Sequence, residues 1–525
     1  MKRTHELIFF ISLVAVLCLV SLVIPRGENT PKLAVWGDTI TLRFPSVEEV
    51  LAAKTDSSIS VEDLLADREQ SMKMGQVPDS VLEARRKLMA AADSLRIRDS
   101  LAVADTIAFF EKFFAENPSK FVCPNNDPKF IVDLMQSLRK GAKNGTVSVF
   151  HYGDSQIEGD RITNYIRKHM QQKFGGSGIG LVPPVGAVPS ISWIQTAQDS
   201  VERYVVDGTL KQAAKNSNYG ALAQVTSLFG KGTLNFKITY AGKRAASVVK
   251  LYCSTKKGFS ATLTPSGFEG ITKNVEPGAC QVVEWKLDNP LKEEFSIKLK
   301  GDAELFALSL LSEKGINVTN VGLRGSSGTY FTKIAPETFK YIHKDMNTKL
   351  VLLEFGGNAT PYLSTEKRLN AYYQSMQAQI NYVKKNVPNA KIILIGPADM
   401  SESVDGKLQT YRNLEATIET LRKCALDNDC AFWNMYDVMG GKNSMQSWVD
   451  QNMAASDYIH FSKKGADRIA KLFVESLDVY DDYGDFMKNL DSKKKHAAKV
   501  RKKKLKKMTD SLRVDAEFIK NTVIE

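Results

Sequence analysis

The segment Val147–Arg161 reads VSVFHYGDSQIEGDR. It opens with β-branched and aromatic residues, which predict a short buried strand that ends at Gly153. We expect a tight Gly-Asp-Ser turn and the first turn of a helix to follow. Ser155 would then lie at the carboxyl end of a strand, where open α/β sheets place their sites. The helix behind it would direct backbone N–H groups towards negative charge formed at the serine.

A Gly-Asp-Ser tripeptide alone is weakly specific, because Ser and Asp are common in turns and at helix N-caps. Three later segments strengthen the interpretation: Asn320–Gly328 (NVGLRGSSG), Leu350–Asn358 (LVLLEFGGN) and Asp457–Ser462 (DYIHFS). In this order, the four segments resemble the four sequence blocks of the SGNH (GDSL) hydrolase superfamily. The resemblance covers most of the chain from about Phe121 to Val474.

The resemblance assigns a role to five residues. Ser155 would be the nucleophile, His460 the base and later the acid, and Asp457 the carboxylate that orients His460. The oxyanion donors would be the backbone N–H of Ser155, the backbone N–H of Gly325 and the side chain of Asn358. Of the six histidines, only His460 has an aspartate at this spacing. The plainer alternatives are that His460 is a partly buried structural side chain, that Gly325 is a turn glycine and that Asn358 caps a strand end.

Two departures from related patterns matter. Ser155 lacks the Gly-x-Ser-x-Gly frame, so the turn is not the nucleophile elbow of an α/β-hydrolase. The third block of the superfamily usually continues with Asp after the Asn, whereas Ala359 follows Asn358 here.

The catalytic part is expected at 118–180 and 318–490, as a three-layer α/β/α fold with a parallel sheet. Its second half alternates strands with helices, which is typical of a parallel sheet covered on both faces. The expected elements are a strand at Leu350–Phe355, a helix at Glu366–Asn386, a strand at Lys391–Ile395, a helix at Leu408–Asp427, a strand at Ala431–Trp433, and a final helix from about Ser462.

Between these parts, residues 181–317 show a different pattern. Apolar and polar residues alternate in short runs separated by turns, as at Phe295, Ile297 and Leu299, which predicts an inserted antiparallel β-sandwich. An insert at this point resembles the carbohydrate-binding-like sandwich of SGNH peptidoglycan O-acetylesterases. Exposed aromatics such as Trp193 or Tyr204 would hold a glycan; alternatively, these aromatics belong to the core.

The N-terminus carries an apolar run, Leu7–Ile24, behind Lys2 and Arg3. Its length suits a spanning helix, so we expect residues 1–25 to be an uncleaved signal-anchor of the inner (cytoplasmic) membrane, single-pass, with the body in the periplasm. A cleaved signal peptide is the alternative. Residues 26–117 are expected to form a spacer or stalk with a charged, helical second half, Ser80–Glu116.

The net charge of +12 comes mostly from the C-terminal tail, residues 491–525. Lys493–Lys507 holds ten Lys and Arg and no acid, so the rest of the chain is close to +2 (12 − 10). This balance argues against nucleic acid as a partner of the catalytic body. The tail is expected to be helical and to contact anionic lipid, an anionic polymer or an acidic protein; a solvated terminus is the alternative.

The cysteines are few, and no spacing among them suits a metal site, so we expect neither metal nor cofactor. Cys424 with Cys430, or Cys253 with Cys280, would be candidates for a disulfide in an oxidising compartment.

These features predict a membrane-anchored serine esterase outside the cytoplasm that removes O-acetyl groups from a glycan through an acyl-enzyme. An O-acetyltransferase with the same triad, or a catalytically silent glycan-binding protein, are the alternatives. Lipase or phospholipase activity fits less well, because the β-insert favours a polar polymer.

Overall fold

The computed structural model describes residues 32–35, 38–41, 103–206, 218–239, 246–291 and 293–522. It divides into two compact units, Met1–Thr106 and Ile107–Glu525. In the first, β1 (Lys32–Val35) pairs antiparallel with β2 (Asp38–Thr41). The apolar run Leu7–Ile24 lies outside the described residues, as does most of the expected spacer. Within the described ranges, no helix is both long and apolar enough to cross a membrane.

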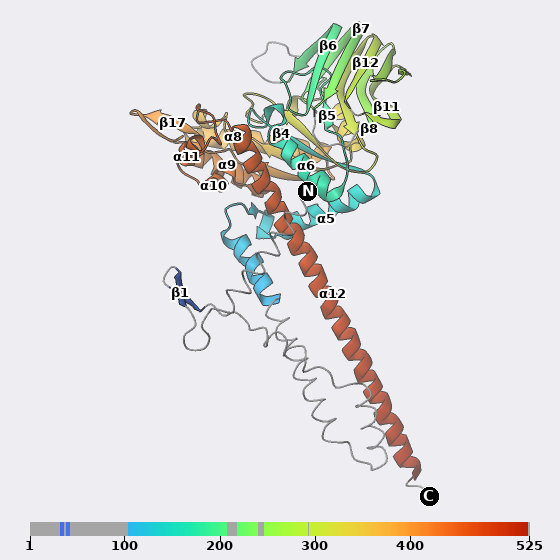
Figure 1. Cartoon of the computed structure of the whole chain (residues 1–525), viewed down its shortest axis with the longest axis vertical. Helices are drawn as coiled ribbons and strands as arrows, with labels where there is room; N and C mark the ends of the chain where they lie inside the picture. Colours follow the sequence, from blue (N-terminus) through green and yellow to red (C-terminus); the bar gives the residue numbers. More distant parts are fainter. Residues whose placement is uncertain are drawn as a thin grey trace, which may run out of the picture. The chain divides into compact units, whose positions relative to one another are not determined.

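A six-stranded sheet forms the centre of the second unit (Figure 1). Its order is β14 (Gly315–Gly322), β4 (Thr146–Gly153), β15 (Thr348–Glu354), β16 (Lys391–Ile395), β19 (Ala431–Trp433) and β3 (Phe121–Val122). The first five strands run parallel, and β3 joins the edge antiparallel. The carboxyl ends of β4, β14 and β15 therefore meet at one edge of the sheet, and Ser155, Gly325 and Asn358 of the first three blocks follow these ends.

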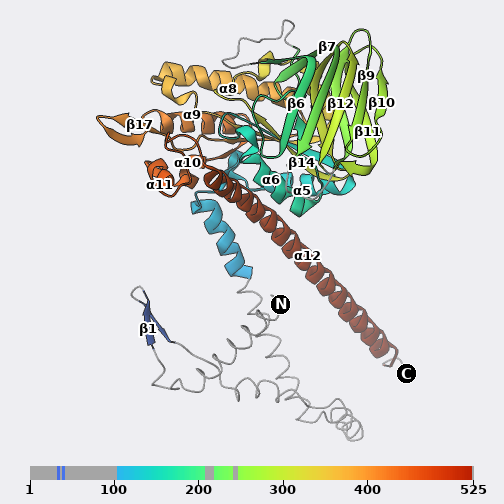
Figure 2. The same cartoon turned by 45° about the horizontal axis from the view of Figure 1, so that its top comes forward.

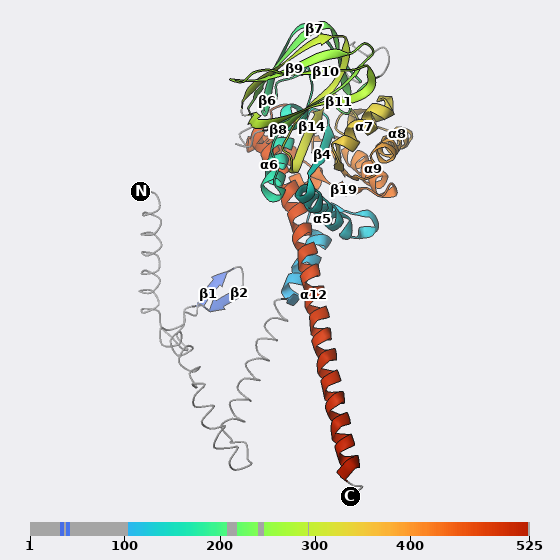
Figure 3. The same ribbon diagram turned by 90° about the vertical axis from the view of Figure 1, so that its right-hand side faces the viewer.

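Helices cover both faces of this sheet (Figure 3). One face packs on α7 (Pro336–Asp345), α8 (Glu366–Asn386) and α9 (Leu414–Asp427). The other packs on α5 (Lys129–Asn144), α6 (Thr163–Phe174) and the first part of α12 (Lys463–Thr522). Because both faces are covered, the central strands read as nearly continuous apolar runs. Short helical segments complete the unit: η2 (Pro124–Asn126), η3 (Glu158–Asp160), η4 (Phe331–Lys333), η5 (Thr360–Tyr362), α10 (Met435–Met439) and α11 (Ser444–Asp450).

The insert is a nine-stranded antiparallel sheet folded into two layers (Figure 2). Its strands are β5 (Gly180–Val182), β6 (Trp193–Val205), β7 (Gln224–Ile238), β8 (Ala246–Thr255), β9 (Phe259–Pro265), β10 (Ile271–Val275), β11 (Gly278–Leu291), β12 (Glu294–Gly301) and β13 (Ala303–Leu311). Inward residues such as Phe295, Ile297 and Leu299 are buried in a shared core, as their alternation predicts. The expected fold class, a three-layer α/β/α fold interrupted by an antiparallel sandwich, is confirmed.

Two local predictions are wrong. The helix expected from Leu408 begins at Leu414, because β17 (Ser401–Val404) and β18 (Lys407–Thr410) form a hairpin first. Its turn, Asp405-Gly406, has positive φ at both residues, a strong hairpin signal that the helical reading overlooked. No helix follows Ser155 directly either: η3 intervenes, and Gly159 and Asp160 with positive φ delay α6 to Thr163.

The C-terminal helix α12 anchors to the sheet and then runs on as a single helix (Figure 1). Near its start, the Tyr480 hydroxyl donates to Phe121 O at 3.0 Å and accepts from Phe121 N at 3.1 Å, which fixes the edge strand β3. Phe110 and Phe114, on a helix over residues 103–116, pack against Tyr483 of α12. The basic segment Lys493–Lys507 lies within α12, so the backbone of this segment is helical.

Candidate active site

Ser155 lies in the turn that leaves β4, at the carboxyl edge of the parallel sheet. The turn is tight because the chain passes very close to its neighbours at Gly153. A Cβ on Gly153 would lie 2.9 Å from the Ile157 side chain and 3.1 Å from the Glu354 carbonyl oxygen. Any side chain at this position would force Ile157 and the Glu354 carbonyl to shift, so glycine lets the chain pass close to both as it turns towards Ser155.

Ser155, His460 and Asp457 form a continuous hydrogen-bonded chain. Ser155 Oγ lies 2.8 Å from His460 Nε2, and His460 Nδ1 lies 2.7 Å from Asp457 Oδ2. The two segments are about 300 residues apart in sequence, and the bridge Ala454–Phe461 holds the histidine loop closed. This is the nucleophile–base–orienter arrangement that acyl transfer requires.

The Asp457 carboxylate is held in its charged form. Partial burial alone would raise its pKa, but hydrogen bonds from the His460 backbone N–H, the His460 ring and the Ile459 N–H outweigh burial and lower the pKa below its usual value. The two backbone bonds to Oδ1 are each 3.0 Å. Asp457 therefore stays ionised at neutral pH and stabilises an imidazolium on His460.

Two residues of the first block to which the resemblance assigns no role, Gln156 and Arg161, hold the serine and histidine loops together. The Gln156 amide donates to Ile459 O at 2.6 Å and accepts from Phe461 N at 3.3 Å, so it clamps the backbone on both sides of His460. Arg161 donates to Phe461 O at 3.2 Å and also to Ser155 O. The sequence offered no signal for these roles, because the partners are backbone atoms.

The expected oxyanion donors lie around the same cleft. Gly325 and Asn358 line it beside Ser155, and Gly325 has φ +76°, a conformation that favours glycine. Asn358 Nδ2 donates to Asp154 Oδ2 at 3.0 Å and to Ser326 O at 3.1 Å. Both amide hydrogens thus already have acceptors, and an oxyanion would have to share one of them.

Asp154 is a buried carboxyl group directly before the serine. Burial raises its pKa to about 7, although a hydrogen bond from Gln156 N opposes the shift; the nearby Glu354 charge adds to it, and the Asn358 amide opposes it. Glu354 is itself buried and lies 3.0 Å from His151 Nε2. Asp154 therefore titrates near neutral pH within contact of two candidate site residues.

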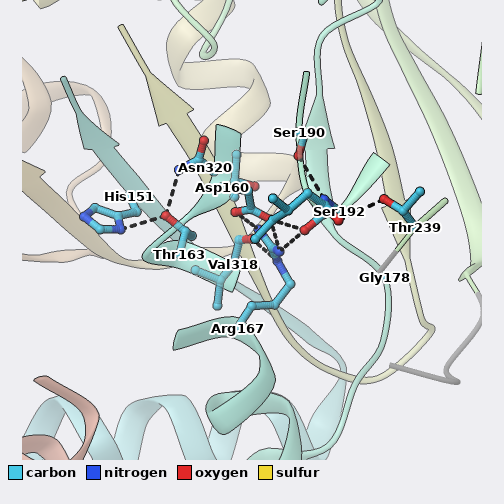
Figure 4. Close-up of polar contacts among 12 residues, drawn as sticks. His151, Asp160, Thr163, Arg167, Gly178, Ser190, Ser192, Thr239, Val318 and Asn320 are labelled. Atoms are coloured by element: carbon cyan, nitrogen blue, oxygen red, sulfur yellow. Dashed lines mark hydrogen bonds and ion pairs between the residues drawn. The ribbon is translucent and has the colours of Figure 1, made fainter. Parts of the chain in front are cut away.

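From His151, the partner of Glu354, a chain of polar side chains continues through the interior (Figure 4). His151 Nδ1 lies 2.9 Å from the Thr163 hydroxyl, which accepts from Asn320 Nδ2 at 2.7 Å. The chain links β4, α6 and β14, so it fixes the three elements that carry the serine turn and the second block. Buried polar networks with satisfied partners are rigid.

The site opens into a cleft of about 890 Å³. Its walls come from the serine turn, the loops after β14 and β15, the histidine loop, and the segment Val188–Ile191 of the insert. Tyr362 on its rim is 70% exposed. The volume lies within the range of about 300–1,000 Å³ that is typical of ligand-binding clefts.

No group of three or more His, Cys, Asp or Glu suited to a metal ion occurs in the part of the chain that the structure describes. The five cysteines described there are unpaired, so neither candidate disulfide is formed. Trp193, proposed as a glycan contact, is half-buried and packs on the sandwich core, and Tyr204 donates to Glu202 at 2.6 Å.

Comparison with known proteins supports the class of fold and of enzyme. The family model described as GDSL-like lipase/acylhydrolase matches residues 292–473, which contain Gly325, Asn358, Asp457 and His460 but not Ser155. The chain thus carries an SGNH (GDSL-type) acylhydrolase domain, and it is a hydrolase of ester bonds. A comparison with curated protein sequences finds no match.

Among solved structures, the fold is similar to one described as a peptidoglycan O-acetylesterase. The identity is 21%, the TM-score is 0.56, and the match covers 67% of this chain and 96% of that one. A family two carbohydrate esterase from Cellvibrio japonicus is 11% identical, with a TM-score of 0.23, and the match covers 55% of this chain and 98% of that one. An acetyl xylan esterase is 18% identical, with a TM-score of 0.23 and coverage of 31% and 81%.

Proposed function

We propose that the protein is a serine esterase that removes O-acetyl groups from a glycan outside the cytoplasm. The observation that carries this proposal is the unbroken chain from Ser155 Oγ through His460 to Asp457, with distances of 2.8 and 2.7 Å. Ser155 and His460 line an open cleft beside the candidate oxyanion donors.

In the first half of the reaction, Ser155 Oγ attacks the acetyl carbonyl carbon while its proton passes to His460 Nε2. The oxyanion of the tetrahedral intermediate is stabilised by the backbone N–H groups of Ser155 and Gly325 and by the Asn358 amide. The intermediate collapses to an acetyl-enzyme, and His460 gives its proton to the departing sugar oxygen. Asp457 stabilises the imidazolium throughout.

In the second half, His460 takes a proton from water, whose oxygen attacks the acetyl-enzyme. Acetate leaves, and Ser155 recovers its proton. The exposure of the dyad favours water as the acceptor: the side chains of His460 and Asp457 are 34% and 46% exposed. A transferase would have to exclude water from the acetyl-enzyme, so hydrolysis is our first choice and transfer to a sugar hydroxyl the second.

The glycan substrate is supported by the fold shared with a peptidoglycan O-acetylesterase and by the contribution of the insert to the cleft wall. An extracytoplasmic location with a membrane anchor at Leu7–Ile24 is consistent with such a substrate, and Lys493–Lys507 would hold the protein near an anionic surface. A silent glycan-binding protein would have no use for the Ser155–His460–Asp457 chain.

The test uses the full-length protein with p-nitrophenyl acetate and, separately, with O-acetylated peptidoglycan. Nitrophenol, free acetate and acetylated sugar are followed together. Ser155→Ala should lower kcat by at least about 10³-fold, whereas Ser403→Ala, an exposed serine of the β17–β18 hairpin, serves as the matched control. Accumulation of acetylated sugar would indicate the transferase, and turnover independent of Ser155 would refute the proposal.

A further inference from the structure

A second cavity of about 400 Å³ lies next to the catalytic cleft, between the insert and the edge of the parallel sheet. The two cavities share a wall made of Glu158, Gly159, Val188, Ser190 and Arg324. The second cavity therefore directly adjoins the catalytic cleft.

The charges around the second cavity do not cancel. Its lining contains three arginines (Arg167, Arg203 and Arg324) and two carboxylates (Glu158 and Asp160), a net charge of +1 (3 − 2). Arg324 Nη2 pairs with Glu158 Oε2 at 2.5 Å. Arg167 pairs with both oxygens of Asp160, at 2.6 and 2.9 Å. The remaining positive charge belongs to Arg203.

Arg203 lies on β6 and is half-buried. Among the described residues, it has neither a carboxylate partner nor a hydrogen-bond acceptor. Burial lowers its pKa, yet a guanidinium remains protonated at neutral pH. A partly desolvated cation without a partner costs stability, and its planar fork of donors matches a carboxylate bidentately. Arg203 is therefore prepared for an anionic ligand.

The wall shared by the two cavities is held by a network of buried hydrogen bonds, and this network includes residues of the insert (Figure 4). The Ser192 hydroxyl donates to Asp160, Thr239 N donates to Ser192 O at 3.0 Å, and Ser192 N donates to the Ser190 hydroxyl at 3.1 Å. Ile191 N donates to Gly159 O at 3.0 Å. The segment that separates the two cavities is thus fixed, which makes the second cavity a formed site.

The cavity also offers an apolar surface. Trp193, at the start of β6, and Leu222 line it. Apolar side chains and a cation that line one cavity suit a sugar ring that carries a carboxylate, because the ring has apolar C–H faces and the carboxylate matches the guanidinium.

We propose that the second cavity is a subsite for a carboxylate-bearing sugar unit, with Arg203 as its anion contact. The proposal rests on the proposed esterase function and specifies its substrate class as an acidic, O-acetylated glycan. The carboxylate could come from a uronic acid or from the lactyl group of a muramic acid unit, and both present the same chemistry to Arg203.

The experiment compares three O-acetylated oligosaccharides with the full-length protein: a neutral xylan oligomer, a galacturonan oligomer, and a peptidoglycan oligomer with a free lactyl carboxylate. Acetate release gives kcat/KM for each. Arg203→Gln should lower the ratio of acidic to neutral kcat/KM about 10- to 100-fold, mainly through KM. Arg203→Lys should retain part of the preference, which shows that the fold of the site survives substitution. Lys298→Gln removes an exposed cation of the same insert that lines neither cavity, and it should leave the ratio unchanged.

The acidic substrate whose preference is lost identifies the source of the carboxylate. An unchanged ratio in Arg203→Gln, with acetate still released, would overturn the subsite and leave the esterase intact. A wild-type enzyme without preference for either acidic substrate would overturn it as well. Absence of Ser155-dependent acetate release from all three substrates would instead refute the proposed function.

Discussion

Asn358 Nδ2 donates to Asp154 Oδ2 at 3.0 Å, immediately behind the candidate nucleophile. Burial raises the pKa of this aspartate to about 7 from the ordinary value of 3.8. A carboxyl group with a raised pKa binds its proton more tightly in the folded state than in the unfolded state. The folded protein therefore loses stability as the pH rises from about 4 to about 7, and the loss is complete above the folded pKa.

We accordingly expect Asp154→Asn to flatten this pH dependence. At 1.36 kcal/mol per pH unit, the wild type should lose up to about 4 kcal/mol across the interval, and the variant should lack this contribution. Urea unfolding between pH 4.5 and 8 measures it. Asp133→Asn, which removes a carboxylate of α5 paired with exposed Lys129, is the control and should follow the wild type. Parallel curves for Asp154→Asn and the wild type would contradict the assignment.

The sequence predicts residues whose chemical type is fixed by the reaction. Ser155 and the Asp457–His460 pair belong to this group, and the structure brings them within hydrogen-bond distance. Alternation likewise predicts the sandwich, because two-layer packing buries every second side chain. Gln156 and Arg161 could not be predicted, since their acceptors are backbone oxygens about 300 residues away. Any sequence supplies such oxygens, so only the fold shows which ones are near.

The Gln156 clamp makes a kinetic prediction. Gln156→Ala removes the contacts with Ile459 O and Phe461 N, which fix the backbone on both sides of His460. A base displaced by even a fraction of an ångström loses alignment with Ser155, so kcat should fall about 10- to 100-fold with little change in KM.

Steady-state kinetics on p-nitrophenyl acetate measures this effect. Gln451→Ala removes an exposed amide whose contact is with Ser447, and it is the matched control. Equal loss of kcat in both variants, or a change confined to KM, would show that Gln156 does not position the histidine.

Asn358 makes a second kinetic prediction, which separates its structural contacts from an oxyanion role. Asn358→Ala should lower kcat about 10²- to 10³-fold if the amide stabilises the transition state. It also leaves Asp154 Oδ2 and Ser326 O without their donor, so unfolding free energy should fall by about 1–3 kcal/mol.

Steady-state kinetics on the folded variant without urea measures the effect on kcat, and urea unfolding of the same variant measures the effect on stability. The exposed Asn389→Ala is the control for both measurements. Loss of stability with normal kcat in Asn358→Ala would assign the residue to the structure of the loop alone and remove it from the oxyanion site.

The buried pair of Asp160 and Arg167 predicts a large effect on stability. Their side chains are 4% and 1% exposed, and Arg167 Nε also donates to Val318 O at 2.7 Å. Arg167→Met leaves the Asp160 charge buried without its cation, which should cost about 3–5 kcal/mol. Asp160→Asn combined with Arg167→Met removes both charges and should recover part of that loss, because the desolvated carboxylate is then absent.

Arg422→Met is the control: its partner Glu419 is 60% exposed, so its pair should contribute under about 1 kcal/mol. Chemical denaturation of the four proteins decides the outcome. A loss for Arg167→Met no larger than that for Arg422→Met would mean that the buried pair contributes no more to stability than the exposed one.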